Sequence, residues 1–291
     1  MKLVLFLLLI VSLAAIGAQT IKTRRLLLGE TAIIHSAILN EYRKLLIYLP
    51  KQYNEAKPNK SRYPVIYLLD GGAHFARVVD AIKQLREVNK AFPPLMVVAI
   101  VNTDRARDLT PSNYLLGPNK EPISDFKTSG GGEQFADFIE KELVPYIHAL
   151  YPADTHKTLM GHSLGGLAVV NILLKHPLFF DAYVAIDPSM WWDDWKLLPE
   201  IRDALKQKSF NGKVLFVGIA NTMPQGTDIK DVRKDISPET NHIRSVLEFA
   251  DILEHSPSTG LKWSYRYYEN HDHGSVTAKA AYDALEFLFV T

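Results

Sequence analysis

Short apolar runs alternate with longer amphipathic stretches along most of this chain, and this alternation constrains the fold more than any other feature. The runs are rich in Val, Ile and Leu, which is typical of strands buried on both faces. They predict eight strands, at Ile33–Leu39, Arg43–Leu49, Pro64–Leu69, Leu95–Val101, Lys157–Gly161, Ala182–Ile186, Lys213–Ile219 and Leu261–Tyr268. The amphipathic stretches predict helices, principally at Phe75–Asn89, Phe135–Leu150, Gly165–Lys175, Glu200–Gln207, Asn241–Glu254 and Ala278–Val290. We therefore expect an α/β fold with a mostly parallel sheet of about eight strands and helices on both faces, and a ligand site at the carboxyl ends of the strands.

The composition excludes several classes of site. The 291 residues include no cysteine, so disulfides, thiolate metal sites and a cysteine nucleophile are excluded. The formal net charge of +1 gives no sign of a basic surface for nucleic acid. We expect a rigid site that needs neither a metal nor an organic cofactor.

The first segment differs from the rest of the chain. Met1-Lys2 precedes an apolar run over Leu3–Ile16, and small residues follow at Gly17 and Ala18. This pattern is typical of a secretory signal peptide, and the run is short for a membrane span. We expect a signal over residues 1–19, export to the periplasm or the extracellular space, no stable membrane insertion after cleavage, and a single domain over 20–291.

The strongest local motif is Gly161-His162-Ser163-Leu164-Gly165, which fits the G-x-S-x-G pattern of a nucleophile elbow. An apolar strand precedes it and a helix follows it, as that turn requires. A sharp turn of this kind strains the serine backbone and leaves no room for side chains at the flanking positions. The motif therefore predicts Ser163 as a nucleophile.

A serine hydroxyl needs a base within hydrogen-bond reach. The loop after the last predicted strand holds His271 and His273, and we favour His273 because Gly274 lets the backbone turn its ring toward the site. His74 is a candidate for lining the site. The other histidines, His242 among them, are interpreted as surface or helix residues.

The acid that orients the base is expected after the predicted strand Lys213–Ile219, where the first position is Asn221 rather than a carboxylate. Asp228 is our first choice, and Asp231 is the second. Asp187, after the preceding strand, Glu239, and a Ser–His dyad without an acid are the remaining alternatives. Each aspartate also has an alternative interpretation as a turn or cap residue.

An oxyanion hole needs two backbone donors. We expect one from Leu164, which follows the nucleophile, and one from Gly72 or Ala73 after the third strand, with Gly72 preferred.

Candidate substrate contacts are cationic and aromatic. Arg105 is positioned to bind an anionic group, and Trp191 and Trp192 to form an aromatic wall. The alternatives are a salt bridge from Arg105 to a neighbouring aspartate, and packing of the tryptophans onto the core.

Together these segments resemble a known family. Residues 67–71 (YLLDG), 161–166 (GHSLGG) and 272–275 (DHGS) are similar to the Putative esterase family of α/β-hydrolases. Residues 102–105 (NTDR) and 189–192 (SMWW) resemble its enterochelin or siderophore esterase branch. The absence of an acid at Asn221 departs from members that carry one directly after the strand.

The resemblance implies an α/β-hydrolase fold and a serine esterase that cleaves a carboxylic ester through an acyl-Ser163 intermediate. It implies the Ser163–His273 pair and a small-molecule substrate such as an enterochelin-like siderophore ester. An acyltransferase, a carbohydrate esterase acting on acetyl or feruloyl groups, and a non-catalytic binding protein on the same fold remain alternatives.

Overall fold

The computed structural model describes residues 24–290, apart from residue 27 and the segments 54–60 and 257–259. The predicted signal peptide over residues 1–19 lies outside these described residues. Within them, no helix combines the length and the apolar character that crossing a membrane requires.

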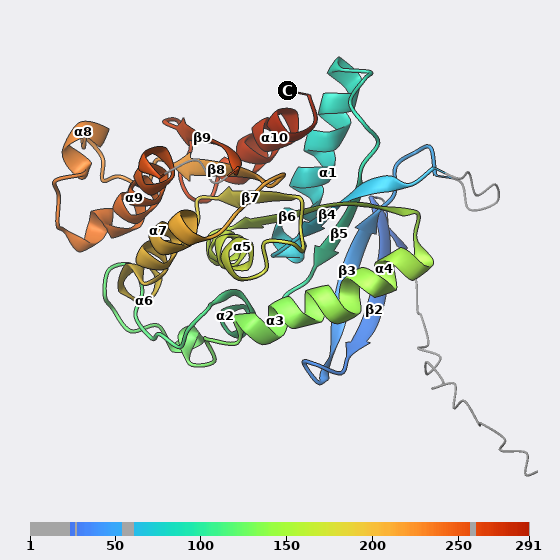
Figure 1. The fold of residues 1–291 in the computed structure, drawn as a ribbon, viewed down its shortest axis with the longest axis horizontal. Coiled ribbons are helices and arrows are strands. Elements are labelled where there is room, and N and C mark those ends of the chain that lie inside the picture. Colours follow the sequence, from blue (N-terminus) through green and yellow to red (C-terminus); the bar gives the residue numbers. More distant parts are fainter. Residues whose placement is uncertain (1–23, 27, 54–60, 257–259, 291) are drawn as a thin grey trace, which may run out of the picture.

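The described strands form one sheet of nine strands, in the order β1-β2-β3-β5-β4-β6-β7-β8-β9 (Figure 1). The first three strands and the β3–β5 pair are antiparallel, and the strands from β5 to β9 run parallel. Their bounds are β1 (Arg24–Leu26), β2 (Gly29–Ser36), β3 (Glu41–Tyr48), β4 (Tyr63–Leu68), β5 (Met96–Ile100), β6 (Ala153–His162), β7 (Ala182–Ile186), β8 (Val214–Ala220) and β9 (Lys262–Tyr268). All eight predicted strands are present, and β1, with three residues, is the additional one.

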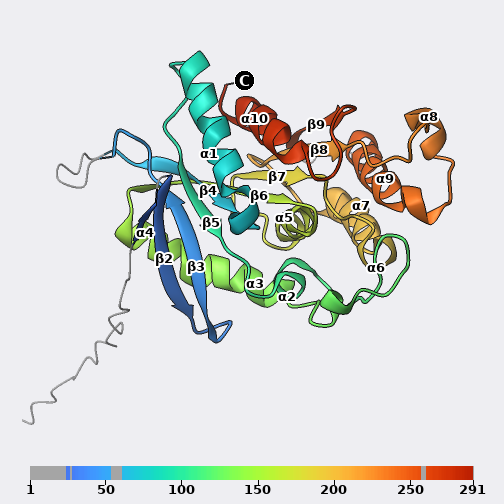
Figure 2. The ribbon, with the colours of Figure 1, turned by 180° about the vertical axis from the view of Figure 1, so that it is seen from behind.

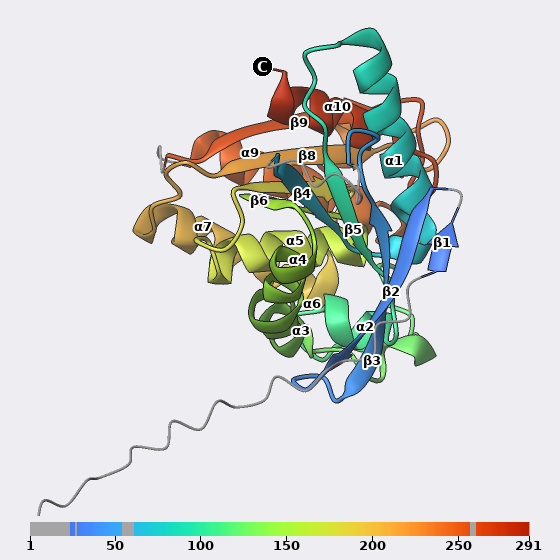
Figure 3. The same cartoon turned by 90° about the vertical axis from the view of Figure 1, so that its right-hand side faces the viewer.

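Helices cover both faces of the sheet, as Figure 3 shows from the side. One face is covered by α1 (Gly71–Val88) and α10 (Val276–Phe289), which enclose one apolar core with the sheet. The other face carries a larger core beneath α3 (Gly132–Phe138), α4 (Val144–Leu150), α5 (Leu164–Lys175), α7 (Leu197–Gln207) and α9 (Asn241–His255). The prediction of a mostly parallel sheet between two helical layers is confirmed.

One predicted helix is interrupted. The stretch Phe135–Leu150 consists of α3, a π-helical turn at Ile139–Leu143, and α4. Pro145 lies in the first turn of α4 and has no N–H to donate to the preceding turn, so the hydrogen-bond ladder rearranges there.

The connection from β5 to α3 holds more structure than the loop predicted for residues 104–132. It contains α2 (Arg105–Leu109) and a 3-10 turn at Ser124–Phe126, and it runs beside α6 (Trp192–Trp195), as Figure 2 shows from behind. A hydrogen bond of 2.7 Å from the Ser112 hydroxyl to Asp193 ties the connection to α6. Two further short elements, α8 (Ile229–Val232) and a 3-10 turn at Pro238–Thr240, lie between β8 and α9.

Candidate active site

Ser163 lies at the turn between β6 and α5. Its backbone has φ 61° and ψ −120°, a region that residues with a side chain rarely adopt. A Cβ atom on Gly161 would lie 2.4 Å from the carbonyl carbon and oxygen of Gly165. Only glycine fits at position 161, and the turn holds the Ser163 side chain at the carboxyl end of the sheet.

Two glycines of α5 let neighbouring loops approach Ser163. A Cβ atom on Gly166 would lie 2.9 Å from Cα of Pro188, in the loop after β7. A Cβ atom on Gly165 would lie 3.1 Å from Oδ2 of Asp70, in the turn after β4. The start of α5 is therefore packed between the loops that follow β4 and β7.

His273 contacts Ser163, as predicted. Its Nε2 atom lies 3.0 Å from the Ser163 hydroxyl oxygen. Asn221 holds the loop that carries His273, because its backbone N–H donates to the carbonyl of His271 and its side-chain amide donates to the carbonyl of Glu269. Asn221 thus stabilises the histidine loop at the position where the sequence suggested an acid.

The carboxylate that meets His273 belongs to Asp187, and the choice of Asp228 is corrected. Oδ2 of Asp187 lies 2.5 Å from Nδ1 of His273. Asp228 is exposed, and its carboxylate caps α8 by accepting the N–H of Lys230. The reason is sheet order: β7 pairs directly with β6, so the residue after β7 lies beside Ser163, whereas the segment after β8 leads to α8 at the periphery (Figure 1). Asp231 lies in α8 as well.

Asp187 is fully buried and firmly held. Its backbone has φ 42° and its N–H donates to the carbonyl of Gly218, while its Oδ1 atom accepts the N–H of Ala220. Burial alone would raise the pKa of Asp187, but the charges and hydrogen bonds of His242 and His273 outweigh burial and hold that pKa below its usual range. Asp187 is therefore an ionised carboxylate behind His273.

Two further histidines, His162 and His74, pack beside His273. His162 donates from Nε2 to the backbone carbonyl of His273 at 2.8 Å. Burial, with the charges of His273 and His74, lowers the pKa of His162 to about 3. His74 is buried with its ring 5.2 Å from that of His162, and burial lowers its pKa too. His74 therefore packs against His162 within the histidine cluster, and its role in lining the substrate site stays a prediction.

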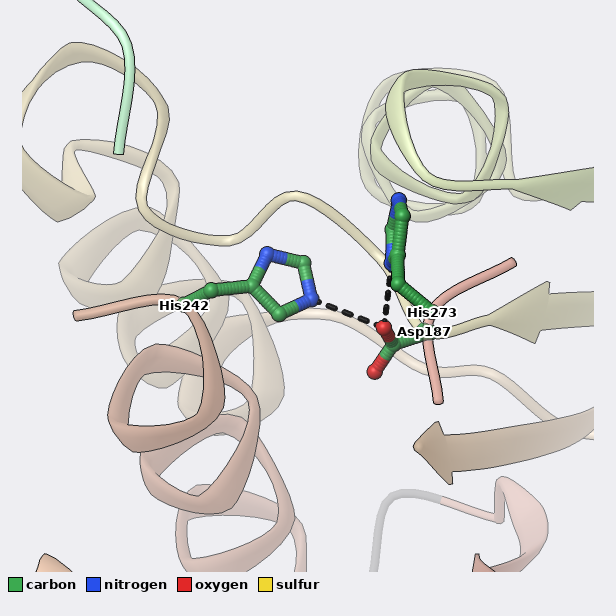
Figure 4. Close-up of side chains that lie close together, drawn as sticks. All are labelled: Asp187, His242 and His273. Atoms are coloured by element: carbon green, nitrogen blue, oxygen red, sulfur yellow. Dashed lines mark hydrogen bonds and ion pairs between the residues drawn. The ribbon is translucent and has the colours of Figure 1, made fainter. Parts of the chain in front are cut away.

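His242 is the residue that the sequence interpretation missed. Its Nε2 atom lies 2.9 Å from Oδ2 of Asp187, the same oxygen that His273 contacts (Figure 4). No local motif marks this position, because His242 is the second residue of an ordinary amphipathic helix and meets Asp187 through the tertiary fold alone.

The predicted oxyanion donors occupy the starts of two helices. Leu164 is the first residue of α5 and Gly72 the second of α1, positions whose N–H groups have no partner within their helix. The N–H of Ala73 donates instead to the carbonyl of Asp70, so Gly72 is the better candidate of the two.

Arg105 pairs with a carboxylate other than those considered from the sequence. Its Nε and Nη2 atoms donate to the two carboxylate oxygens of Asp70, at 2.8 and 3.0 Å, and Asn102 donates to the same carboxylate. The Arg105 side chain is 39% exposed and borders a cavity of about 720 Å³ that reaches Leu164 beside Ser163. Other lining residues of this cavity include Ile123, Ser124, Phe126, Lys127 and Thr128.

The tryptophans form no exposed wall. Trp191 and Trp192 are buried, and the indole N–H of Trp192 donates to the carbonyl of Ser112. Their rings pack against Phe126 on the β5–α3 connection, with the Trp192 and Phe126 centroids 4.9 Å apart. The expectation of direct substrate contact is corrected, because both side chains fasten this connection to the core.

A serine on a strained strand-to-helix turn, a histidine after the last strand that contacts this serine, and a buried carboxylate behind the histidine define a protein of the α/β-hydrolase fold with a Ser–His–Asp group. The sequence pattern of the family described as "Putative esterase" matches residues 36–275, and the chain belongs to that family.

Relatives and solved structures agree with this assignment. Ferri-bacillibactin esterase BesA of Bacillus subtilis is 35% identical over 165 residues, which are 53% of this chain and 56% of the relative. Siderophore triacetylfusarinine C esterase of Aspergillus fumigatus is 28% identical over 170 residues, 55% of each chain. The crystal structure of an IroE-like serine hydrolase from Shewanella oneidensis is 31% identical and superposes with a TM-score of 0.79 over 92% of this chain and 80% of the other. The chain thus spans little more than half the length of these curated relatives, and most of the length of the solved structure.

Proposed function

We propose that this protein is a serine esterase that hydrolyses a carboxylic ester through an acyl-Ser163 intermediate, with Ser163, His273 and Asp187 as its catalytic group. The observation that carries the proposal is the continuous chain of hydrogen-bond contacts from the Ser163 hydroxyl through both nitrogens of His273 to the buried carboxylate of Asp187. Each contact joins residues that are far apart in the sequence.

The geometry suits proton transfer in one direction. Asp187 accepts the N–H at Nδ1 of His273, which leaves Nε2 as the free base that faces the hydroxyl. As Ser163 attacks the ester carbonyl, its proton moves to Nε2, and the imidazolium is stabilised by Asp187. The same proton then passes to the departing alcohol, and a water molecule deprotonated by His273 releases the acid and restores Ser163.

The developing oxyanion needs donors that are already in place. The N–H groups of Leu164 and Gly72 supply them in this proposal, since each lies at the start of a helix whose dipole favours negative charge. The lack of a side chain at Gly165 lets the turn at Asp70 approach the start of α5, so the two helix starts lie close together.

We propose a siderophore ester as the substrate class. The relatives named as esterases of ferri-bacillibactin and triacetylfusarinine C support this choice. The cavity beside Leu164 is lined by the cations Arg105 and Lys127, by the carboxylates of Asp104 and Asp125, by hydroxyl groups and by Phe126, so it offers charged, polar and aromatic contacts to a large polar ester. Export through the segment 1–19 completes the proposal and rests on the sequence pattern alone.

The first experiment compares the wild type with Ser163→Ala. Wild-type protein should hydrolyse p-nitrophenyl acetate and take up a fluorophosphonate label on Ser163, and the variant should do neither while its circular dichroism is unchanged. Activity retained by a folded Ser163→Ala protein would contradict the proposal.

The second experiment addresses the substrate. Purified protein is incubated with siderophore, acetyl, feruloyl and thioester substrates, and products are identified by mass spectrometry with and without added acceptor alcohols. We expect the highest kcat/KM for a siderophore ester and free acid as the product. Transfer of the acyl group to the added alcohol would instead indicate an acyltransferase.

A further inference from the structure

One carboxylate oxygen, Oδ2 of Asp187, contacts two imidazole rings. Nδ1 of His273 lies 2.5 Å from it and Nε2 of His242 lies 2.9 Å from it, and Figure 4 shows the carboxylate between the two rings. A carboxylate oxygen only accepts, so both ring nitrogens must carry a proton where they face it. The two rings also contact each other edge to face, with centroids 4.9 Å apart.

These separations fit hydrogen bonds rather than a shared metal ion. Among the described residues, Asp187, His242 and His273 form a group of ligand atoms within 4.8 Å of one another. Two ligands of a tetrahedral zinc ion at about 2.0–2.1 Å would lie roughly 3.3 Å apart. Both N···O separations are shorter than that, so the cluster is bonded through protons.

His242 is held in place by the start of α9. The side chain of its neighbour Asn241 donates to the carbonyl of Pro118 and accepts the indole N–H of Trp195. The carbonyl of His242 accepts the hydroxyl of Ser245, and the His242 side chain is only 12% exposed. These contacts hold the ring of His242 beside Asp187.

We infer that His242 is a positioning residue, which fixes Asp187 by a second N–H donor and limits how strongly that carboxylate stabilises the imidazolium form of His273. The physical reason is that Oδ2 shares its negative charge between two donors, so each hydrogen bond is weaker than one alone. A catalytic base must be orientated by its carboxylate and must still lose its proton readily near the working pH. The inference rests on the proposed function for its catalytic meaning.

Other charged and titratable groups face this cluster and are unchanged by replacing His242. His162, from β6, and His74, from α1, interact with His273 from one side. Asp272 interacts with it from its own loop. A shift that follows from substitution at position 242 alone is therefore assigned to the contact with Asp187.

The test compares His242→Phe, which keeps a planar ring but has no donor, with His242→Gln, whose side-chain amide keeps an uncharged N–H donor. His255→Phe is the matched control, since His255 is exposed at the other end of α9. The titration midpoint of His273 is measured by NMR on protein labelled with ¹⁵N-histidine, without substrate, and kcat/KM for p-nitrophenyl acetate is measured across roughly pH 5 to 9, the range in which a catalytic histidine titrates.

In His242→Phe we expect the midpoint of His273 to rise by roughly 0.4 to 1 pH unit, the equivalent of one hydrogen bond. The acid limb of the kcat/KM profile should rise with it, so activity falls by up to about tenfold on that limb and much less at high pH. In His242→Gln the midpoint of His273 and the acid limb of the kcat/KM profile should stay close to those of the wild type, and His255→Phe should match the wild type in both.

An unchanged midpoint in a folded His242→Phe protein would overturn the inference, and so would a His242→Gln protein as altered as His242→Phe. The NMR measurement needs no turnover. If the midpoint of His273 shifts in His242→Phe but the wild-type protein has no esterase activity, the proposed function is refuted, and the contact between His242 and Asp187 is still established.

Discussion

Nε2 of His162 lies 2.8 Å from the carbonyl oxygen of His273, so the residue that precedes Ser163 holds the main chain of the histidine that contacts Ser163. The ring of His162 is buried against that of His273, with centroids 4.5 Å apart. Burial, with the charges of His273 and His74, lowers the pKa of His162 to about 3, from an ordinary value of 6.5. The nucleophile turn and the histidine loop are thereby joined through a neutral imidazole.

This contact predicts an acid-dependent loss of stability. As pH falls from about 6.5 to about 3, the unfolded chain binds a proton at His162 while the folded protein does not, so stability that is present above 6.5 is lost. The slope from this one group is at most about 1.4 kcal/mol per pH unit. His162→Gln keeps a side-chain N–H but does not titrate, so its free energy of unfolding should fall less steeply in urea titrations between about pH 7 and pH 4. Equal slopes for the two proteins would refute this explanation.

Asp187→Asn should remove most of the activity and leave the protein folded. The amide introduced at this position would place a donor against Nδ1 of His273, so the ring would favour the tautomer that carries its proton on Nε2. In that tautomer Nε2 cannot accept the proton of Ser163. We expect kcat/KM, measured by ester hydrolysis, to fall by roughly 10²–10⁴-fold.

The matched control for that variant is Asp228→Asn. Asparagine is an equally good helix cap, so the N–H of Lys230 keeps its acceptor and activity should match the wild type. A large loss of activity in Asp228→Asn, with little loss in Asp187→Asn, would show that Asp228, the first choice from the sequence, is the acid that orients His273.

Gly166→Ala should damage the site, while Gly72→Ala should be tolerated. The added Cβ at position 166 would lie 2.9 Å from Cα of Pro188, and relieving that clash displaces the loop that carries Asp187. We expect a loss of about 1–3 kcal/mol in stability and at least a roughly tenfold fall in kcat/KM, measured by thermal unfolding and ester hydrolysis. At position 72 the added Cβ would meet, among the residues that the structure describes, only Val101, at 3.9 Å, and the backbone N–H proposed as an oxyanion donor is retained. A comparable loss of stability and kcat/KM in Gly166→Ala and Gly72→Ala would contradict the explanation by a clash with Pro188.

Arg105→Ala should lower kcat more than it raises KM for p-nitrophenyl acetate. Two of the N–H donors of Arg105 are bonded to Asp70, so the side chain supports the turn that carries Gly72. Asn102 remains as a donor to that carboxylate, and Arg105 is partly exposed, which together limit the expected fall in kcat to roughly tenfold. Steady-state kinetics with this neutral substrate separate the two parameters. A rise in KM with kcat unchanged would contradict a supporting role for Arg105.

Much of this molecule was predictable from short stretches of sequence. Apolar runs located the eight strands, because strands buried on both faces of a parallel sheet are apolar along their whole length. Amphipathic stretches located the main helices. The G-x-S-x-G motif placed Ser163 on a turn, and Gly274 after His273 indicated the correct histidine of two. These features depend on residues close together in the chain, where steric and hydrogen-bond rules act directly.

The carboxylate could not be chosen in this way. Asp187, Asp228 and Asp231 each follow a strand in the sequence, and only the pairing of β7 with β6 brings Asp187 to His273. The partner His242 lies 55 residues beyond Asp187 and carries no local signal. The burial of Trp191 and Trp192 likewise depends on where the β5–α3 connection packs.

The amino-acid order by itself thus determined the parallel sheet, the strained turn at Ser163 and the histidine that meets it. The tertiary structure alone decided which carboxylate stands behind that histidine and which second imidazole shares it. The physical reason is that a hydrogen bond between side chains is set by strand order and loop packing, which bring together residues that no periodicity or spacing relates.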